Sequence, residues 1–139
     1  MKPSFVVDSS VALAWCFGDE ATPATRALLQ RMGGEAALVP AWWFVELINV
    51  LALAERKGRI TPAKVAEFIA LVDGFDLEID EEGPGRAFTH LLPLCRSHRL
   101  TSYDALYLDL ALRRQLPLAT LDDPLRKAAK KLGVKVLGA

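Results

Sequence analysis

The chain has few of the residues on which many kinds of functional site depend. Its 139 residues include only two cysteines, Cys16 and Cys95, and two histidines, His90 and His98. The cysteines lack metal-ligand spacing, so we interpret them as buried thiols in a reducing cytoplasm rather than as a zinc or disulfide framework. Neither histidine has a matching partner in the sequence, and we interpret both as surface or structural residues.

An excess of charge of one sign and a long uninterrupted apolar run are also missing. Seventeen Lys and Arg balance seventeen Asp and Glu, so the field of the whole molecule does not indicate a nucleic-acid binder. The most apolar run, residues 38–54, contains Glu46 and Asn49 and is too short for a membrane span. Because Asp8 interrupts the start of the chain, we expect no secretory signal and no membrane partner, and a cytoplasmic location. The length and the 52% hydrophobic content suit one globular domain, residues 1–139.

Short apolar runs alternate along the chain with longer helical patterns. Strands are expected at 4–7, 37–39, 77–79, 117–120 and 134–137, and helices at 10–17, 23–32, 41–57, 62–74, 84–97, 103–114 and 124–132. This alternation predicts an α/β protein with a parallel sheet covered by helices on both faces. In such sheets, ligands bind outside the carboxyl ends of the strands.

Two of the expected strands are each followed by acids. Asp8 comes directly after "FVV" and before Ser9 and Ser10. Asp is a preferred helix cap, but either serine could cap the next helix, which would leave Asp8 free for function. The strand "PLAT" is followed by Asp122 and Asp123. Because Asp123 precedes a proline, it is the expected cap of the last helix, and Asp122 is then the site residue.

Two further acids lie on helices among apolar neighbours. Glu46 is the only charged residue of its run, and among its neighbours at helical spacing only Asn49 is strongly polar. An unpaired buried charge costs several kcal/mol, so Glu46 is at the edge of the apolar face, paired, or bound to a cation. Asp104 also has apolar neighbours, although the helix dipole alone favours an acid in a first turn. Asp109 differs, because an ion pair with Arg113 at i+4 accounts for it.

Several carboxylates that face one sheet edge repel one another unless a cation joins them. Oxygen ligands without cysteine or histidine suit Mg²⁺ or Mn²⁺, and such a site typically serves phosphate chemistry. The residues therefore predict a carboxylate-bound hard cation, with Asn49 able to hydrogen-bond the Glu46 carboxylate or what it binds.

Five segments together resemble a known family. They are "VVDSSVALAW", "PAWWFVELINVL", "RKGRIT", "HRLTSYDALYLDLAL" and "LPLATLDDPLRKAA". In this order and spacing, from Val6 to about Val134, they resemble the PIN-domain ribonucleases, and most closely the VapC-like toxins of bacterial type II toxin–antitoxin pairs. Each motif is weak alone, whereas the ordered set is highly specific.

The resemblance implies a fold, an activity and partners. It implies a three-layer α/β/α sandwich with a mainly parallel sheet of about five strands, and a magnesium-dependent endoribonuclease site. It also implies an RNA substrate, a homodimer, and a cognate antitoxin whose C-terminal segment occupies the active-site groove. With no net charge, RNA binding would need a local basic rim, for which Arg96, Arg99 and Arg113 are the candidates.

The resemblance also assigns roles to individual residues. Asp8, Glu46 and Asp104 match the three core acids that hold the metal, and Asp122 matches a fourth, more variable acid. Ser10 and Thr120 match hydroxyl positions near the first and the fourth acid. With Asn49, these two hydroxyls are expected to support the metal ligands.

Two alternatives remain open at this point. In the first, the chain is a catalytically weak PIN-like binding module, and Trp15, Trp42 and Trp43 dock a partner helix. In the second, Asp8 is the nucleophile of an aspartyl-phosphate protein, although Ser10 stands where a phosphatase of the haloacid-dehalogenase type has a second acid. Metal-binding and RNA-cleavage assays separate these alternatives from the nuclease.

Overall fold

The structure, a computed structural model, describes all 139 residues. Its single sheet has five strands: β1 (Pro3–Val7), β2 (Ala36–Pro40), β3 (Asp76–Asp80), β4 (Leu118–Ala119) and β5 (Val136–Leu137). The strands lie in the order β3-β2-β1-β4-β5, and every neighbouring pair is parallel. The predicted strands are therefore all present, although the last two are shorter than expected.

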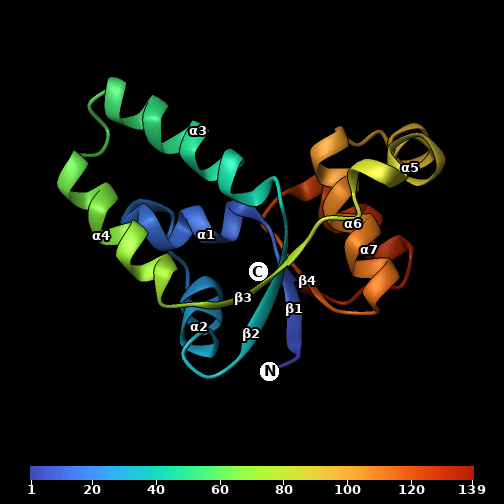
Figure 1. Ribbon diagram of the computed structural model, residues 1–139, viewed down its shortest axis with the longest axis horizontal. Coiled ribbons are helices and arrows are strands. Elements are labelled where there is room, and N and C mark those ends of the chain that lie inside the picture. Colours follow the sequence, from blue (N-terminus) through green and yellow to red (C-terminus); the bar gives the residue numbers. More distant parts are fainter.

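Helices cover both faces of this sheet. They are α1 (Ser9–Cys16), α2 (Pro23–Arg31), α3 (Trp43–Arg56), α4 (Pro62–Asp73), α5 (Leu92–His98), α6 (Ser102–Arg114) and α7 (Asp123–Lys131). Helices α1 to α4 lie on one side of the sheet and α5 to α7 on the other (Figure 1). The predicted α/β sandwich with a parallel sheet is confirmed. None of the helices combines the length and apolar composition that a bilayer-spanning segment needs.

One predicted helix, 84–97, is not a continuous α-helix. A 3₁₀ turn at Pro84–Arg86 leads into a π-helical turn at Ala87–Leu91, and only then does α5 begin. The physical reason is Pro93, which has no backbone N–H to donate to a carbonyl one turn earlier. A further 3₁₀ turn, Gly18–Glu20, follows α1 and was not predicted.

The core lies around the two central strands. All five residues of β2 are buried, whereas β3 at the sheet edge exposes most of its side chains. Trp43 is fully buried, and the indole N–H of the half-buried Trp15 donates to the Thr25 carbonyl at 2.8 Å. Of the three tryptophans, only Trp42 is exposed, at 45%. A docking surface made of all three, as one alternative required, is therefore absent.

The order of the strands places a crevice between β1 and β4. The chain first adds β2 and β3 on one side of β1, and then returns to add β4 and β5 on the other. At such a switch point the connections leave in opposite directions, which opens a binding crevice at the carboxyl ends of the strands. Asp8 directly follows β1, and Thr120 directly follows β4.

Candidate functional site

Asp8 is held at the switch point by three hydrogen-bond donors. Its Oδ1 accepts from the Ser10 hydroxyl at 2.5 Å and from the Val11 backbone N–H at 3.2 Å, and its Oδ2 accepts from the Thr120 hydroxyl. The expectation that a serine caps α1 is wrong: Asp8 is the N-cap, and Ser10 donates to it. The carboxylate is only 3% exposed. Burial raises the pKa of Asp8 to about 6, although the hydrogen bonds from the two hydroxyls and the Val11 N–H act to lower it.

The two hydroxyls next to Asp8 tie the ends of β1 and β4 together. Ser10 Oγ accepts from the Leu121 N–H at 2.9 Å, and Thr120 Oγ1 accepts from the Asp122 N–H at 3.1 Å. Each hydroxyl therefore donates to Asp8 and accepts from the backbone after β4. This arrangement fixes the Asp8 carboxylate relative to the loop that carries Asp122.

Asp122, rather than Asp123, caps α7. Asp122 has an extended backbone conformation, and its Oδ2 accepts from the Leu125 N–H at 3.0 Å. Asp123 is the first residue of the helix, and its side chain is exposed. The prediction that Asp123 caps this helix is therefore wrong, because the proline occupies the second helical position instead of the first.

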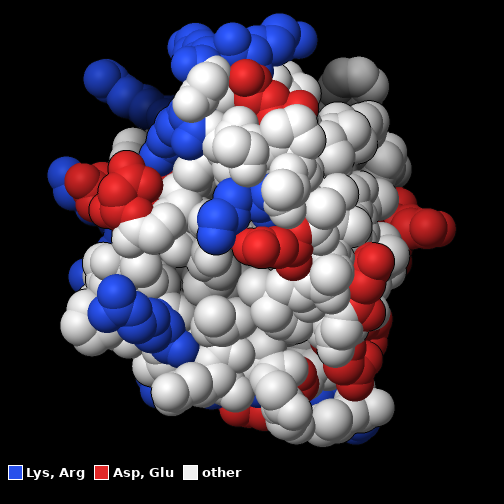
Figure 2. Space-filling model, turned by 90° about the vertical axis from the view of Figure 1, so that its left-hand side faces the viewer, with Lys and Arg blue, Asp and Glu red and all other residues white.

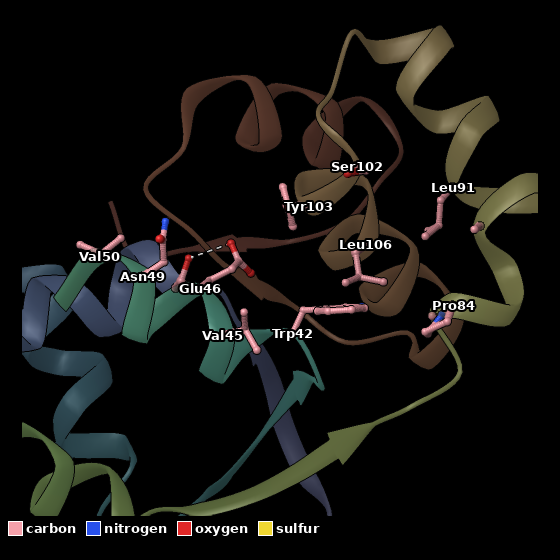
Figure 3. A pocket seen from close by; sticks show the side chains of 13 residues that line it. Trp42, Val45, Glu46, Asn49, Val50, Pro84, Leu91, Ser102, Tyr103 and Leu106 are labelled. Atoms are coloured by element: carbon pink, nitrogen blue, oxygen red, sulfur yellow. Dashed lines mark hydrogen bonds between the residues drawn. The ribbon is translucent and has the colours of Figure 1, made fainter. Parts of the chain in front are cut away.

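Glu46 projects from the first turn of α3 and is half-buried. Its carboxylate accepts from the Tyr107 hydroxyl at 2.6 Å and from the Ser9 hydroxyl at 3.3 Å; the second bond is drawn in Figure 3. Burial raises the pKa of Glu46, and both hydrogen bonds oppose that shift. Tyr107 was not predicted as a site residue. The available signal was its position three residues after Asp104, on the same side of one helix.

Asp104 lies in the first turn of α6, whose N-cap is Thr101. The Asp104 carboxyl is half-buried, and burial is the main cause that raises its pKa to about 7. Repulsion and hydrogen bonding with Asp122 add to the shift, and repulsion by Asp8 adds further. Asp104 therefore lies within electrostatic reach of two of the other predicted acids.

The four acids fit a hard divalent cation by their chemistry. They come from four different segments and offer only oxygen ligands, which Mg²⁺ and Mn²⁺ prefer. Burial disfavours the charged forms of Asp8, Glu46 and Asp104, and repulsion by neighbouring carboxylates adds to this at Asp8 and Asp104. A nearby cation would favour the charged forms. No three Asp, Glu, His or Cys side chains, however, stand in a ready-made metal-binding arrangement. The structure thus supplies the ligand chemistry without a preformed cage.

A groove of about 840 Å³ opens beside Glu46. Trp42, the N-cap of α3, and Val45 of that helix lie on one wall, and Pro84 and Leu106 lie on the other (Figure 3). The lining is mainly apolar, and it includes the exposed rings of Trp42 and Tyr103. Asn49 also lines this groove; its side chain is exposed and makes no hydrogen bond to Glu46.

The opposite wall of the groove is anchored by ion pairs that the sequence did not reveal. Arg86 donates to both carboxylate oxygens of Asp109, at 2.7 and 2.9 Å. Arg113 donates to both oxygens of Asp80, at 2.8 and 3.1 Å, and lies 3.7 Å from Asp109. The predicted Asp109–Arg113 pair is therefore the weaker contact. With a side chain only 16% exposed, Arg113 is a structural residue and is withdrawn as an RNA contact.

Comparisons with known proteins agree with this fold. The family model described as PIN domain matches residues 5–131. The crystal structure of PAE2754 from Pyrobaculum aerophilum is similar to the whole fold, with a TM-score of 0.70 and 21% sequence identity. That match covers 96% of this chain and 83% of the other. A comparison with curated proteins finds no match. The chain belongs to the PIN domain family, whose members are generally nucleases and typically bind Mg²⁺.

Proposed function

We propose that the protein is a metal-dependent endoribonuclease that acts as the toxin of a toxin–antitoxin pair. The observation that carries the proposal is the group of acids around the switch point between β1 and β4. Asp8, Glu46 and Asp104 would hold Mg²⁺ or Mn²⁺, and Asp122 would support them. When bound, the metal polarises the phosphate and supplies hydroxide from water at neutral pH.

The protein's own groups orient these acids. Ser10, Thr120 and the Val11 N–H hold the Asp8 carboxylate in one position. Tyr107 and Ser9 do the same for Glu46. Burial and repulsion by Asp122 raise the pKa of Asp104 in the metal-free protein, and a bound cation would favour its charged form.

The groove beside Glu46 supports RNA as the substrate. Unpaired RNA bases stack on exposed aromatic side chains, and Trp42 and Tyr103 offer two such rings, 45% and 56% exposed. The toxin role rests on the resemblance to VapC-like proteins. We further propose that a cognate antitoxin binds in this groove. We also propose that two copies of the chain form a homodimer through α3, where Val45 and Ile48 are 52% and 62% exposed.

No observation favours the aspartyl-phosphate alternative. Ser10 stands where a phosphatase of the haloacid-dehalogenase type has its second acid. Its hydroxyl donates to the Asp8 carboxylate instead. The binding-module alternative predicts that the acids bind no metal, and the following experiment tests it.

Thermal unfolding with and without millimolar Mg²⁺ or Mn²⁺ tests the metal site. A ligand that binds only the folded state raises the melting temperature, so we expect stabilisation of the wild type and none of Asp8→Asn. Asp123→Asn is the matched control, because it removes an exposed carboxylate next to Asp122. The wild type and this control should also cleave single-stranded RNA with Mg²⁺, and Asp8→Asn should not.

Two outcomes would contradict the proposal. Full RNA cleavage by Asp8→Asn would remove Asp8 from the site. No metal-dependent stabilisation together with no cleavage of any RNA would favour the binding module instead.

A further inference from the structure

A second cleft, of about 450 Å³, lies between the carboxyl end of α5 and helix α7. Five of its seven lining residues are polar, and its cations are Arg99, Lys127 and Lys131. The side chains of all three are exposed, and none forms an ion pair. The neighbouring His98 lines the same cleft, and the only acid of α7 is Asp123. The cleft therefore carries net positive charge.

Helix periodicity places the two lysines on one side of α7. Pro124, Lys127 and Lys131 are spaced by three and four residues, so they follow one another along a single face of the helix. Lys130 is exposed as well but does not line the cleft. The chain therefore offers a matched pair of positions, inside and outside the cleft, on the same helix.

The basic cleft begins next to one of the candidate acids. Pro124, on its α7 wall, lies two residues after Asp122, and two residues of chain span at most about 7 Å. On the other wall, Arg99 lies two residues before Thr101, which caps the helix that carries Asp104.

Arg99 stands where the backbone favours glycine. It ends α5 in the left-handed conformation, with φ 53° and ψ 45°. Glycine adopts this conformation without steric cost, whereas residues with a Cβ rarely do. The local backbone conformation therefore does not explain why this position carries an arginine.

The face that carries α4 has a mixed charge pattern. Basic and acidic side chains both occur there on a mostly uncharged surface (Figure 2). Two of its cations are paired: Arg59, between α3 and α4, with Asp19 and Glu20, and Lys64 of α4 with Glu67.

We propose that the cleft formed by Arg99, Lys127 and Lys131 binds a backbone phosphate of the RNA strand, next to the bond that is cut. This inference rests on the proposed ribonuclease function and adds to it the path of the strand. Cations that contact phosphates bind without regard to base sequence and contribute to affinity through counterion release. The cleft would thus position the strand, and the groove with Trp42 would contact its bases.

The test measures equilibrium binding of fluorescent single-stranded RNA oligonucleotides of mixed sequence, with EDTA present to prevent cleavage. Lys127→Gln/Lys131→Gln is compared with Lys130→Gln/Lys135→Gln, which removes the same charge from exposed positions outside the cleft. We expect the cleft variant to bind at least about tenfold more weakly at moderate salt. Its slope of log affinity against log salt should be smaller by about 0.7, the value for one lost phosphate contact on a single strand.

Arg99→Gly separates charge from folding. Because glycine suits the left-handed position, this variant should melt no lower than the wild type while it binds RNA more weakly. A loss of affinity accompanied by a lower melting temperature would indicate a structural role and overturn the assignment of Arg99.

Three results would overturn the inference. Equal losses in both double variants would mean that general charge, rather than the cleft, attracts RNA. If the cleft variant binds RNA with wild-type affinity and cleaves it at the wild-type rate with metal, the protein is a ribonuclease but the cleft does not bind the RNA strand. An acidic peptide such as polyglutamate that binds the cleft more tightly than RNA does would assign it to a protein partner.

Discussion

The burial of the Asp8 carboxylate has a direct thermodynamic consequence. Its pKa of about 6 in the folded protein lies above the ordinary value of 3.8, so the folded state binds the Asp8 proton more tightly than the unfolded state does. The stability contributed by this proton is complete below pH 4 and is lost as the pH rises through about 6. In metal-free buffer, the ionised carboxylate at pH 8 therefore costs about 1–3 kcal/mol of folding free energy.

Asp8→Asn should remove this pH dependence. Without metal, we expect the variant to gain stability relative to the wild type between pH 5 and pH 8, as measured by urea unfolding in EDTA. Comparing the two proteins cancels the titrating groups that do not interact with Asp8, whereas Asp104, which Asp8 repels, also titrates differently in the variant. If the free energy of unfolding of the wild type falls no more than that of the variant over this pH range, ionisation of Asp8 costs little folding free energy.

Tyr107 offers a second prediction, because its hydroxyl orients Glu46 from a helix 61 positions away in the chain. Tyr107→Phe keeps the buried ring, which is 1% exposed, and removes the donor that lowers the pKa of Glu46. We expect the acid limb of the cleavage pH profile to move to higher pH, and activity at limiting Mg²⁺ to fall about 10–100-fold. Tyr103→Phe, which alters an exposed ring that makes no hydrogen bond within the protein, should leave the pH profile unchanged. An unshifted profile in Tyr107→Phe would exclude the positioning role.

At the residue scale, the sequence supported only part of the site. The rule that ligands bind beyond strand ends was enough to single out Asp8 and Asp122. Which residue caps each helix was not predictable, because neighbouring Ser and Asp side chains cap equally well and tertiary packing sets the backbone angles that choose between them. The Tyr107–Glu46 bond joins remote helices, and no local pattern indicates it.

At the scale of elements, the segment 83–91 forms one wall of the groove and packs tightly on α6. A Cβ added at Gly83 would lie 2.4 Å from Leu106 Cδ1, and Leu106 is itself only 5% exposed. Gly83→Ala should therefore force this wall away from α6 and destabilise the protein by about 1–3 kcal/mol.

Gly85→Ala is the control for this change, because a Cβ added at Gly85 would meet no other atom within 4 Å, and its effect should stay within about 0.5 kcal/mol. Urea unfolding measures both variants. Combining Gly83→Ala with Leu106→Val should recover part of the lost stability, since the shorter side chain relieves the clash. Equal stability of the two single alanine variants would show that Leu106 rearranges without cost.

The same segment shows why element boundaries are harder to predict than element types. Alternating apolar runs and capped helical patterns were enough to predict the five strands and six of the seven helices. The segment 84–97 reads as a helix because its side chains have helical spacing, yet Pro93 breaks the backbone ladder. Arg86 then holds it to α6 through Asp109, a contact between residues that lie 23 positions apart.

At the scale of the whole molecule, the outer face of α3 predicts association between two copies of the chain. Val45, Ile48 and Ala52 follow one another along the helix with exposed side chains. A 14-residue helix is about 21 Å long, so two copies packed side by side would cover a contiguous apolar stripe. Exposed apolar patches of this kind commonly mark interaction sites.

We therefore expect a homodimer at micromolar concentration in sedimentation velocity, and a monomer for Ile48→Glu. Ile69→Glu is the matched control, because it places the same charge at a comparably exposed position, 51% against 62%, on α4. Since Ile48 does not line the groove beside Glu46, the monomeric variant should keep its response to Mg²⁺ in thermal unfolding. If the wild type is monomeric at tens of micromolar, or if the two variants dissociate equally, the α3 stripe is not the dimer interface. It would then be available to the antitoxin, whose binding the same two variants can measure.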